Sequence, residues 1–203
     1  MDSSRSLETK EKMNMIDALI DGDVSDNSTH HYQKVLFLKR IKDLFKSKIF
    51  IETGTADGNM IGDLLNDFER LYSIEAVESR ADNAKLRFSD QKHVEILSGC
   101  SGKIIELVCN SLQQSDTCLF FLDGHQDPRF PYAADIQICP LIDELTAIFT
   151  RKNKFDVIAI DDFRLIGTEI GWPSLEDIEK ITIQNNFETF LCKNRDVLLL
   201  KAK

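Results

Sequence analysis

From residue 47 onward, short β-branched or aromatic runs alternate with amphipathic stretches of helical period. The strand-like runs are KIFIET, LYSIEA, HVEILSG, TCLFFLDG and FDVIAIDD. Between them lie stretches that can form crossover helices, such as KIIELVCNSL and ICPLIDELTAIFTR. Because parallel strands must be joined by crossovers, this alternation predicts a doubly wound α/β fold, in which helices cover both faces of a parallel sheet.

The last two strand-like runs, FETFLC and DVLLLK, break this alternation because only the residues KNR separate them. So short a gap cannot hold a crossover helix, and the two runs must therefore pair antiparallel as a terminal hairpin. The complete prediction is a Rossmann-like, seven-stranded, mostly parallel sheet that ends in a C-terminal antiparallel hairpin.

Residues 1–46 differ in pattern from the rest of the chain. We expect an N-terminal helical extension that packs on the core, in two pieces at about 7–20 and 31–45, separated by the turn-rich segment DGDVSDNST. Residues 47–203 form the main domain, since a chain of 203 residues suits a single hydrophobic core.

The composition argues against several classes of partner. Lys and Arg number 25 against 34 Asp and Glu, and the resulting net charge of −9 opposes binding to nucleic acid and to anionic membranes. The five cysteines show no C-x-x-C spacing, and no stretch approaches the roughly 20 apolar residues of a membrane span. We therefore expect a cytoplasmic protein with reduced thiols. The oligomeric state stays open, and a homodimer is one alternative.

Ligands of open α/β sheets bind at the carboxyl ends of the strands, so the residues that end each run are the candidates for a site. The first run leads into ETGTADGN, in which Gly54 and Gly58 let the backbone turn tightly and approach a ligand. The dinucleotide pattern G-x-G-x-x-G fails here at two of its three glycines, whereas an acid followed by G-x-G-x-G departs only at Ala56. A loop of this kind on its own connects a strand to a helix as often as it binds a cofactor.

The next two strand ends add polar groups to the same edge of the sheet. Glu75 ends the second run and can accept hydrogen bonds from ribose hydroxyls, in a nicotinamide site as well as in an S-adenosylmethionine site. Ser101, after the third run, either donates to an adenine nitrogen or caps the following helix. These residues predict a nucleoside pocket without selecting its cofactor.

The fourth and fifth runs end in acidic residues, Asp123 and the pair Asp161 and Asp162. Three carboxylates at adjacent strand ends would raise one another's pKa unless a cation joined them, and magnesium, calcium or manganese suits such oxygen ligands. We therefore expect a metal site at Asp123, Asp161 and Asp162. Where no metal binds, His125 is the candidate base, although a ring packed at the strand end is the alternative.

Five segments, taken with the terminal hairpin, resemble a family of uncharacterised class I S-adenosylmethionine-dependent methyltransferases. They are FIETGTADG, SIEA, FLDGH, PLIDELTAI and IAIDDFRLIG. The family is marked by an F-x-E-T-G-T start and an L-D-G-H segment, and it is similar more distantly to metal-dependent O-methyltransferases. The resemblance spans about 48–200. It implies that S-adenosylmethionine binds at Glu52, Gly54, Thr55, Gly58, Glu75, Ser101 and Asp123, and that Mg²⁺ binds at Asp123, Asp161 and Asp162.

The same resemblance implies methyl transfer to an oxygen of a small molecule or sugar, with His125 and Asp123 at the reaction centre. Ala56 and Cys100 depart from the family pattern. These departures favour, as an alternative, a binding protein that keeps the fold without turnover. An NAD-dependent oxidoreductase is a weaker alternative, because both the glycine spacing and the terminal hairpin argue against it.

Overall fold

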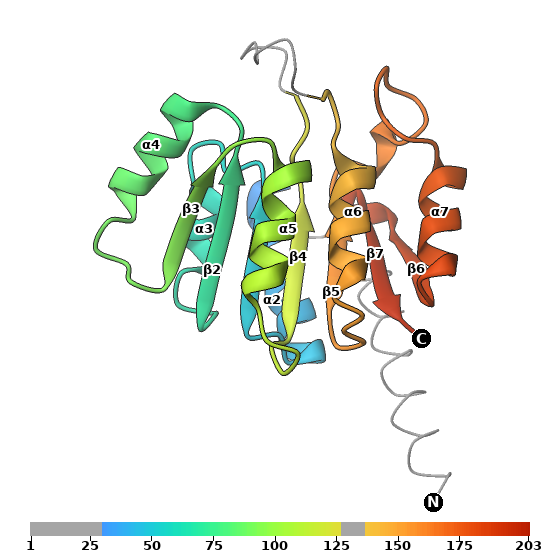
Figure 1. Ribbon diagram of the computed structural model, residues 1–203, viewed down its shortest axis with the longest axis horizontal. Helices are drawn as coiled ribbons and strands as arrows, with labels where there is room; N and C mark the ends of the chain where they lie inside the picture. Colours follow the sequence, from blue (N-terminus) through green and yellow to red (C-terminus); the bar gives the residue numbers. More distant parts are fainter. Residues whose placement is uncertain (1–29, 127–136) are drawn as a thin grey trace, which may run out of the picture.

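The computed structural model describes residues 30–126 and 137–203, which form a seven-stranded sheet flanked by helices (Figure 1). The strands lie in the order β3-β2-β1-β4-β5-β7-β6. They are β1 (Ile49–Thr53), β2 (Arg70–Glu75), β3 (Val94–Ser98), β4 (Cys118–Leu122), β5 (Val157–Ile160), β6 (Phe187–Cys192) and β7 (Val197–Ala202). The first of the two helices expected near the N-terminus lies outside the described residues.

The pairing of the strands confirms the predicted topology. Strands β1 to β5 pair in parallel, whereas β7 pairs antiparallel with both β5 and β6. A short 3-10 helix, Lys193–Arg195, joins the two strands of the terminal hairpin. Strand β1 lies between β2 and β4, so the chain reverses its direction of travel across the sheet there. At such a switch point the loops after neighbouring strands diverge and leave room for a ligand.

The two faces of the sheet support separate apolar cores, because successive side chains of a strand point to opposite sides. In β1, Ile49 and Ile51 join one core cluster and Phe50 joins the other. The first face is covered by α5 (Ser101–Ser111), α6 (Leu141–Thr150) and α7 (Leu175–Gln184) (Figure 1). On the second face lie α2 (His30–Phe45) and α3 (Asn59–Leu64), while α4 (Glu78–Arg87) packs along β2 and β3.

Helix α2 is held against the sheet by an apolar stripe. Its residues Val35, Leu38 and Ile41 are buried, and their spacing of three places them on one helical face. Full burial of such a side chain contributes about 1.5–3 kcal/mol. This packing fixes the position of Lys34, which is also buried, relative to the ends of the strands.

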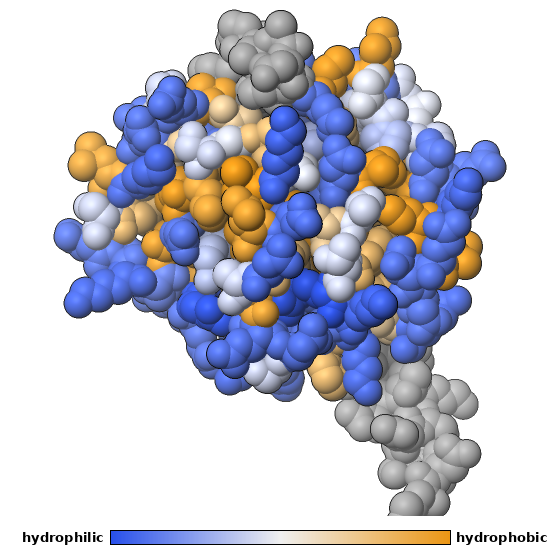
Figure 2. Space-filling model, in the orientation of Figure 1, coloured by the Kyte–Doolittle hydropathy of each residue, from blue (hydrophilic) through white to orange (hydrophobic). Residues whose placement is uncertain are grey.

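The outer surfaces of the helices face solvent. Helix α7 begins with a capping box between Ser174 and Asp177, and it buries Ile178 and Thr182 toward the core. Figure 2 shows hydrophilic and apolar side chains interspersed over the face that carries α5, α6 and α7. Among the helices of residues 30–126 and 137–203, none combines the length and the apolar character needed to cross a membrane.

Candidate active site

The loop after β1 turns at Gly54, a position that requires glycine. Gly54 has a φ of +86°, and a Cβ built on it would lie 2.4 Å from the carbonyl oxygen of Asp123. Its N–H donates to the carbonyl of Ile74 at 2.9 Å. The loop therefore passes close over the end of β4, and Gly54 lines the clefts on both sides of that strand end.

Gly58 and Ala56 shape the rest of this loop. Gly58 is the N-cap of α3 with a φ of +74°, and a Cβ there would lie 2.8 Å from the ring of Phe88. Ala56, which stands where the cofactor pattern has glycine, is also left-handed, with a φ of +49°. This conformation costs a residue with a Cβ about 1–2 kcal/mol. The backbone thus keeps the glycine conformation at the position where the sequence departs from the pattern.

Glu75, at the end of β2, is fixed by the backbone around it. Its Oε2 accepts a hydrogen bond from the Ala56 N–H at 2.8 Å, and its Oε1 accepts one from the Val77 N–H at 2.9 Å. Each carboxylate oxygen can accept more than one hydrogen bond. Glu75 therefore keeps acceptor capacity for hydroxyl groups of a ligand.

A cleft that we call the Glu75 cleft opens between the loops that follow β1, β2, β3 and β4. It is lined by Gly54, Ile74, Glu75, Ala76, Cys100, Ser101, Gly124, His125, Gln126, Gln137 and Pro140. Ser101 is the first residue of α5, and Cys100 occupies the N-cap position. Ser101 therefore does not cap the helix, which was one of its two predicted roles.

Glu144 of α6 lies beneath this cleft, although the sequence does not single it out. Burial raises its pKa to about 7, and the hydroxyls of Ser101 and Thr53 act in the opposite direction. A Cβ on Gly124 would lie 2.9 Å from Glu144 Oε1, which places the carboxyl directly under the turn after β4. An acid within an amphipathic helix usually faces solvent, so no sequence signal marks this residue.

Glu52 lies beneath the glycine loop and is 2% exposed. Its Oε2 accepts a hydrogen bond from Ser73 Oγ at 2.6 Å, and Ser73 Oγ lies 2.6 Å from Thr55 Oγ1. Burial raises the pKa of Glu52 to about 8; the Ser73 hydrogen bond opposes this change, and the Asp123 carboxylate adds to it. At neutral pH the Glu52 carboxyl is therefore largely protonated.

A second cleft, which we call the Lys34 cleft, opens at the carboxyl ends of the strands beside α2. It is lined by His30, His31, Lys34, Glu52, Gly54, Thr55, Ala56, Asp57, Asn59, Met60, Phe121, Asp123 and Asp161. Gly54 belongs to both clefts, whereas Asp123 lines this one and Gly124 lines the other. The end of β4 therefore separates the two clefts.

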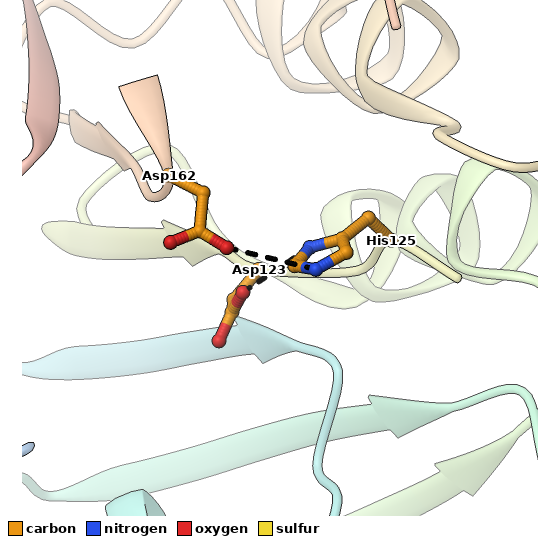
Figure 3. A group of neighbouring side chains, drawn as sticks. All are labelled: Asp123, His125 and Asp162. Atoms are coloured by element: carbon orange, nitrogen blue, oxygen red, sulfur yellow. Dashed lines mark ion pairs between the residues drawn. The ribbon is translucent and has the colours of Figure 1, made fainter. Parts of the chain in front are cut away.

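Three of the predicted site residues meet after β4 and β5 (Figure 3). His125 Nδ1 lies 3.4 Å from Asp123 Oδ1, and His125 Nε2 lies 3.6 Å from Asp162 Oδ2. One possible ligand atom from each of Asp123, His125 and Asp162 lies within 4.8 Å of the others, which is compact enough to hold a cation. Asp162 stands in a left-handed conformation, with a φ of +52°.

Asp161, the remaining acid of the expected metal set, contacts a lysine instead. Lys34 Nζ donates to both Asp161 oxygens at 2.5 Å, and it lies 3.8 Å from Asp162 Oδ1. Burial and the Asp123 carboxylate raise the pKa of Asp161, while Lys34 opposes them. Sequence reasoning missed Lys34, because the helix that carries it lies 127 residues before its partner.

The basic groups of the site also interact with these acids. Burial alone would lower the pKa of His125, but the neighbouring Asp123 and Asp162 carboxylates raise it above its ordinary value. The imidazole packs against Trp172, with ring centroids 5.1 Å apart. Arg164 Nη1 donates to Asp162 Oδ1 at 2.7 Å and also pairs with Asp196. Each of these contacts restricts a side chain at the strand ends.

No protein-family model and no curated protein matches the chain, but several solved structures do. A Podospora anserina methyltransferase, solved with S-adenosylhomocysteine (SAH) bound, superposes with a TM-score of 0.61 at 13% identity. The match covers 100% of this chain and 94% of that one. The O-methyltransferase TomG of Streptomyces achromogenes, in complex with SAM, gives 0.59 at 16% identity, with 100% of each chain covered.

An O-methyltransferase from Bacillus cereus, in complex with SAH, gives a TM-score of 0.54 at 18% identity and covers 100% of this chain and 92% of that one. These likenesses extend over the whole fold, including the terminal hairpin. The finer resemblance to the family marked by the L-D-G-H segment stays a prediction. The chain has the fold of the class I S-adenosylmethionine-dependent methyltransferases.

Proposed function

We propose that this protein is an S-adenosylmethionine-dependent methyltransferase that methylates an oxygen of a small hydroxylated molecule, such as a sugar. The observation that carries the proposal is the bare backbone at Gly54 beside the Glu75 carboxylate, at the switch point of the sheet. Structures of the same fold are described as methyltransferases bound to SAM or SAH. This shared fold supports the same cofactor here.

The lining of the Glu75 cleft fits the adenosine part of such a cofactor. Glu75 can accept hydrogen bonds from ribose hydroxyls, and Ser101 offers a hydroxyl near the position expected for the base. Gly54 lets the loop after β1 pack against the backbone of Asp123, and a side chain there would displace this wall of the cleft. When bound, S-adenosylmethionine supplies an electrophilic methyl group on a sulfonium.

The Lys34 cleft fits the acceptor. Its wall carries polar side chains that include His30, His31, Asp57 and Asn59, and these can hydrogen-bond to hydroxyl groups. The net charge of −9 disfavours nucleic acid as the acceptor. Asp123 stands where the two clefts approach each other, so an acceptor in the Lys34 cleft would lie next to a cofactor in the Glu75 cleft.

His125 lines the Glu75 cleft and contacts Asp123, which stands at the border with the Lys34 cleft. It is our candidate for the group that takes the proton of an acceptor hydroxyl at that border. The Asp123 and Asp162 carboxylates raise its pKa, so the neutral imidazole, which is the form that accepts a proton, is a stronger base. Asp123 orients the imidazole ring and stabilises its charged form after proton transfer, as a carboxylate does for a histidine base in other enzymes. The contact with Trp172 limits rotation of the ring.

The acids at the strand ends fit a divalent cation poorly. A metal shared by Asp123, Asp161 and Asp162 would have to displace the ammonium that contacts both Asp161 oxygens. Asp123, His125 and Asp162 are the groups that would hold an ion, but the two imidazole nitrogens already lie 3.4 Å and 3.6 Å from the two carboxylates. We therefore assign no step of the reaction to a metal.

We further propose that residues 47–203 bind the cofactor, while the N-terminal part up to residue 46 completes the acceptor site. The position of Lys34 in the wall of its cleft supports this division. All five cysteines lie in the described ranges and are free thiols, which supports a cytoplasmic location.

The proposal is tested by calorimetry of the full chain with S-adenosylmethionine and S-adenosylhomocysteine (SAH). We expect dissociation constants within about 1 µM–1 mM, the ordinary range for enzyme ligands. Gly54→Ala should abolish binding of both ligands, because the new Cβ would lie 2.4 Å from the carbonyl oxygen of Asp123 and so displace the wall of the cleft. Gly167→Ala is the matched control: Gly167 is also left-handed, but its Cβ would meet no atom closer than 3.7 Å.

The outcomes separate the candidate functions. Absence of binding by a folded protein at millimolar ligand would contradict the proposal. Cofactor binding without methyl transfer to a broad panel of hydroxylated acceptors would favour the binding protein without turnover. Binding of NAD⁺ in place of both sulfur ligands would favour the oxidoreductase.

A further inference from the structure

Lys34 occupies an unusual position for a lysine. Its side chain is buried, although lysine is among the residues least often found inside a protein. The ammonium is held at the ends of β4 and β5, 2.5 Å from both oxygens of Asp161 and 3.8 Å from Asp162. The apolar stripe of α2 holds the backbone of this helix against the sheet. This packing fixes the position of Lys34 at the strand ends.

The charges at this end of the sheet are balanced by the protein's own side chains. Asp161 contacts Lys34, Asp162 contacts Arg164 and His125, and Asp123 contacts His125. Three acids at adjacent strand ends therefore meet three basic groups from three different segments. Neighbouring positive charge favours the ionised form of clustered acids, and here the chain's own basic side chains supply it.

We propose that Lys34 is the resident cation of the acceptor site, standing in the place of a divalent metal, so that methyl transfer in this protein is metal-independent. The proposal rests on the proposed function. Lys34 is a positioning residue: it holds Asp161 and Asp162 in fixed orientations at the edge of the cleft. An ammonium has three N–H donors, and Asp161 accepts two of them. The Oδ1 atom of Asp162 lies 3.8 Å from the same ammonium, so one lysine constrains both acids.

The test measures Mn²⁺ binding. Electron paramagnetic resonance reports the concentration of the unbound ion during the titration. Wild-type protein should bind no Mn²⁺ below about 1 mM, because the ammonium already compensates the acids. Lys34→Met removes the ammonium that contacts Asp161 and lies near Asp162, and it should raise Mn²⁺ affinity by about tenfold or more. Adding Asp161→Asn to that variant should remove the gain, because one of the ligands is lost.

Two variants serve as controls. Lys34→Arg keeps the charge and should remain as indifferent to Mn²⁺ as the wild type. Lys39→Met removes another lysine of α2, which pairs with Asp67 at 3.1 Å on the surface, and it should change nothing. In the same preparations, addition of EDTA should leave the rate of methyl transfer by the wild type unchanged.

The inference is overturned if wild-type protein binds Mn²⁺ as tightly as Lys34→Met does, or if the folded Lys34→Met variant gains no affinity. Should Lys34→Met fail to fold, the wild-type titration alone still decides, since tight Mn²⁺ binding in the presence of Lys34 contradicts a resident ammonium. SAH binding by the wild type tests the proposed function separately, because failure there does not depend on Mn²⁺.

Discussion

Two buried ion pairs lie at opposite ends of the parallel strands. At the end where β4 and β5 begin, Arg151 Nε donates to Asp156 Oδ2 at 2.9 Å, and Asp156 Oδ1 accepts from the Cys118 N–H at 3.1 Å. The guanidinium also reaches the carbonyl of Cys109. At the end where β5 finishes, Lys34 meets Asp161 beside two further acids and a cleft.

The two ends differ in how their charged groups are compensated. Both members of the Arg151–Asp156 pair form further hydrogen bonds with the backbone, and the pair joins the end of α6 to the starts of β4 and β5. It therefore stabilises the fold. The other end carries features that cost free energy: left-handed Ala56 and Asp162, and carboxyls whose pKa burial raises, such as Glu52. Such features are retained where a site uses them. Substitutions at the first end should therefore reduce stability, and those at the second should alter binding.

The largest effect is expected at the Arg151 pair. Arg151→Met leaves the Asp156 carboxylate buried without its partner, and it should lower the free energy of unfolding by about 3–5 kcal/mol. Lys34→Met should cost less, about 1–2 kcal/mol, because Asp161 borders a cleft and its raised pKa makes protonation easy. Urea denaturation at neutral pH measures the free energy of unfolding of both variants. Equal losses would contradict the proposed difference between the two ends of the sheet.

The next effect concerns pH. Glu52 loses its proton near its ordinary pKa of 4.5 when unfolded and near 8 when folded. The stability that the protonated form contributes is therefore fully present below pH 4.5 and is lost as the pH rises through 8.

Glu52→Gln removes this titration, and at pH 8 it should raise the free energy of unfolding by about 2–3 kcal/mol. Urea denaturation at pH 5 and at pH 8 is the measurement. A variant that shows the same loss of stability between these pH values as the wild type would contradict the buried, neutral Glu52.

A smaller effect is expected where Gly54 packs against the backbone of Asp123. Gly54→Ala and Gly167→Ala both place a Cβ on a left-handed residue, but only the first brings it against the backbone of Asp123. We expect Gly54→Ala to be less stable than Gly167→Ala by about 1–2 kcal/mol. Thermal unfolding of the two variants gives this difference, and equal melting temperatures would show that the loop has room to move.

The smallest effect is expected at Ala56. Ala56→Gly relieves the left-handed strain of about 1–2 kcal/mol but increases the freedom of the unfolded chain, so the net gain in stability should be about 0.5 kcal/mol. Ala84→Gly, in the buried face of α4, should instead lose about 1 kcal/mol. Chemical denaturation compares the two, and a loss at both positions would mean that Ala56 is not strained.

The fold could be predicted from the chain because its signals are local. Strand-like runs, crossover lengths and the short KNR gap determine the topology, and the strand ends locate Gly54, Glu75 and Asp123 at one edge. The charge balance of the site could not be predicted in this way. The rotation of α2 that turns Lys34 inward depends on how the helix packs on the sheet.

Glu144 escaped prediction for a similar reason. An acid in an amphipathic helix is ordinarily solvated, whereas the turn at Gly124, together with Ser101 and Thr53, encloses this one. The sequence thus predicts which strand ends meet, but not which side chains from the covering helices fill the space between them.

We propose that the carboxyl ends of the strands form the ligand site, whereas the opposite end stabilises the fold. Amide hydrogen exchange by mass spectrometry, with and without saturating SAH, tests it directly. We expect slower exchange in the loops at 53–58, 75–77, 99–101 and 123–126, and no change around Arg151 and Asp156. Unchanged exchange in those loops, or protection confined to the Arg151 end, would contradict it.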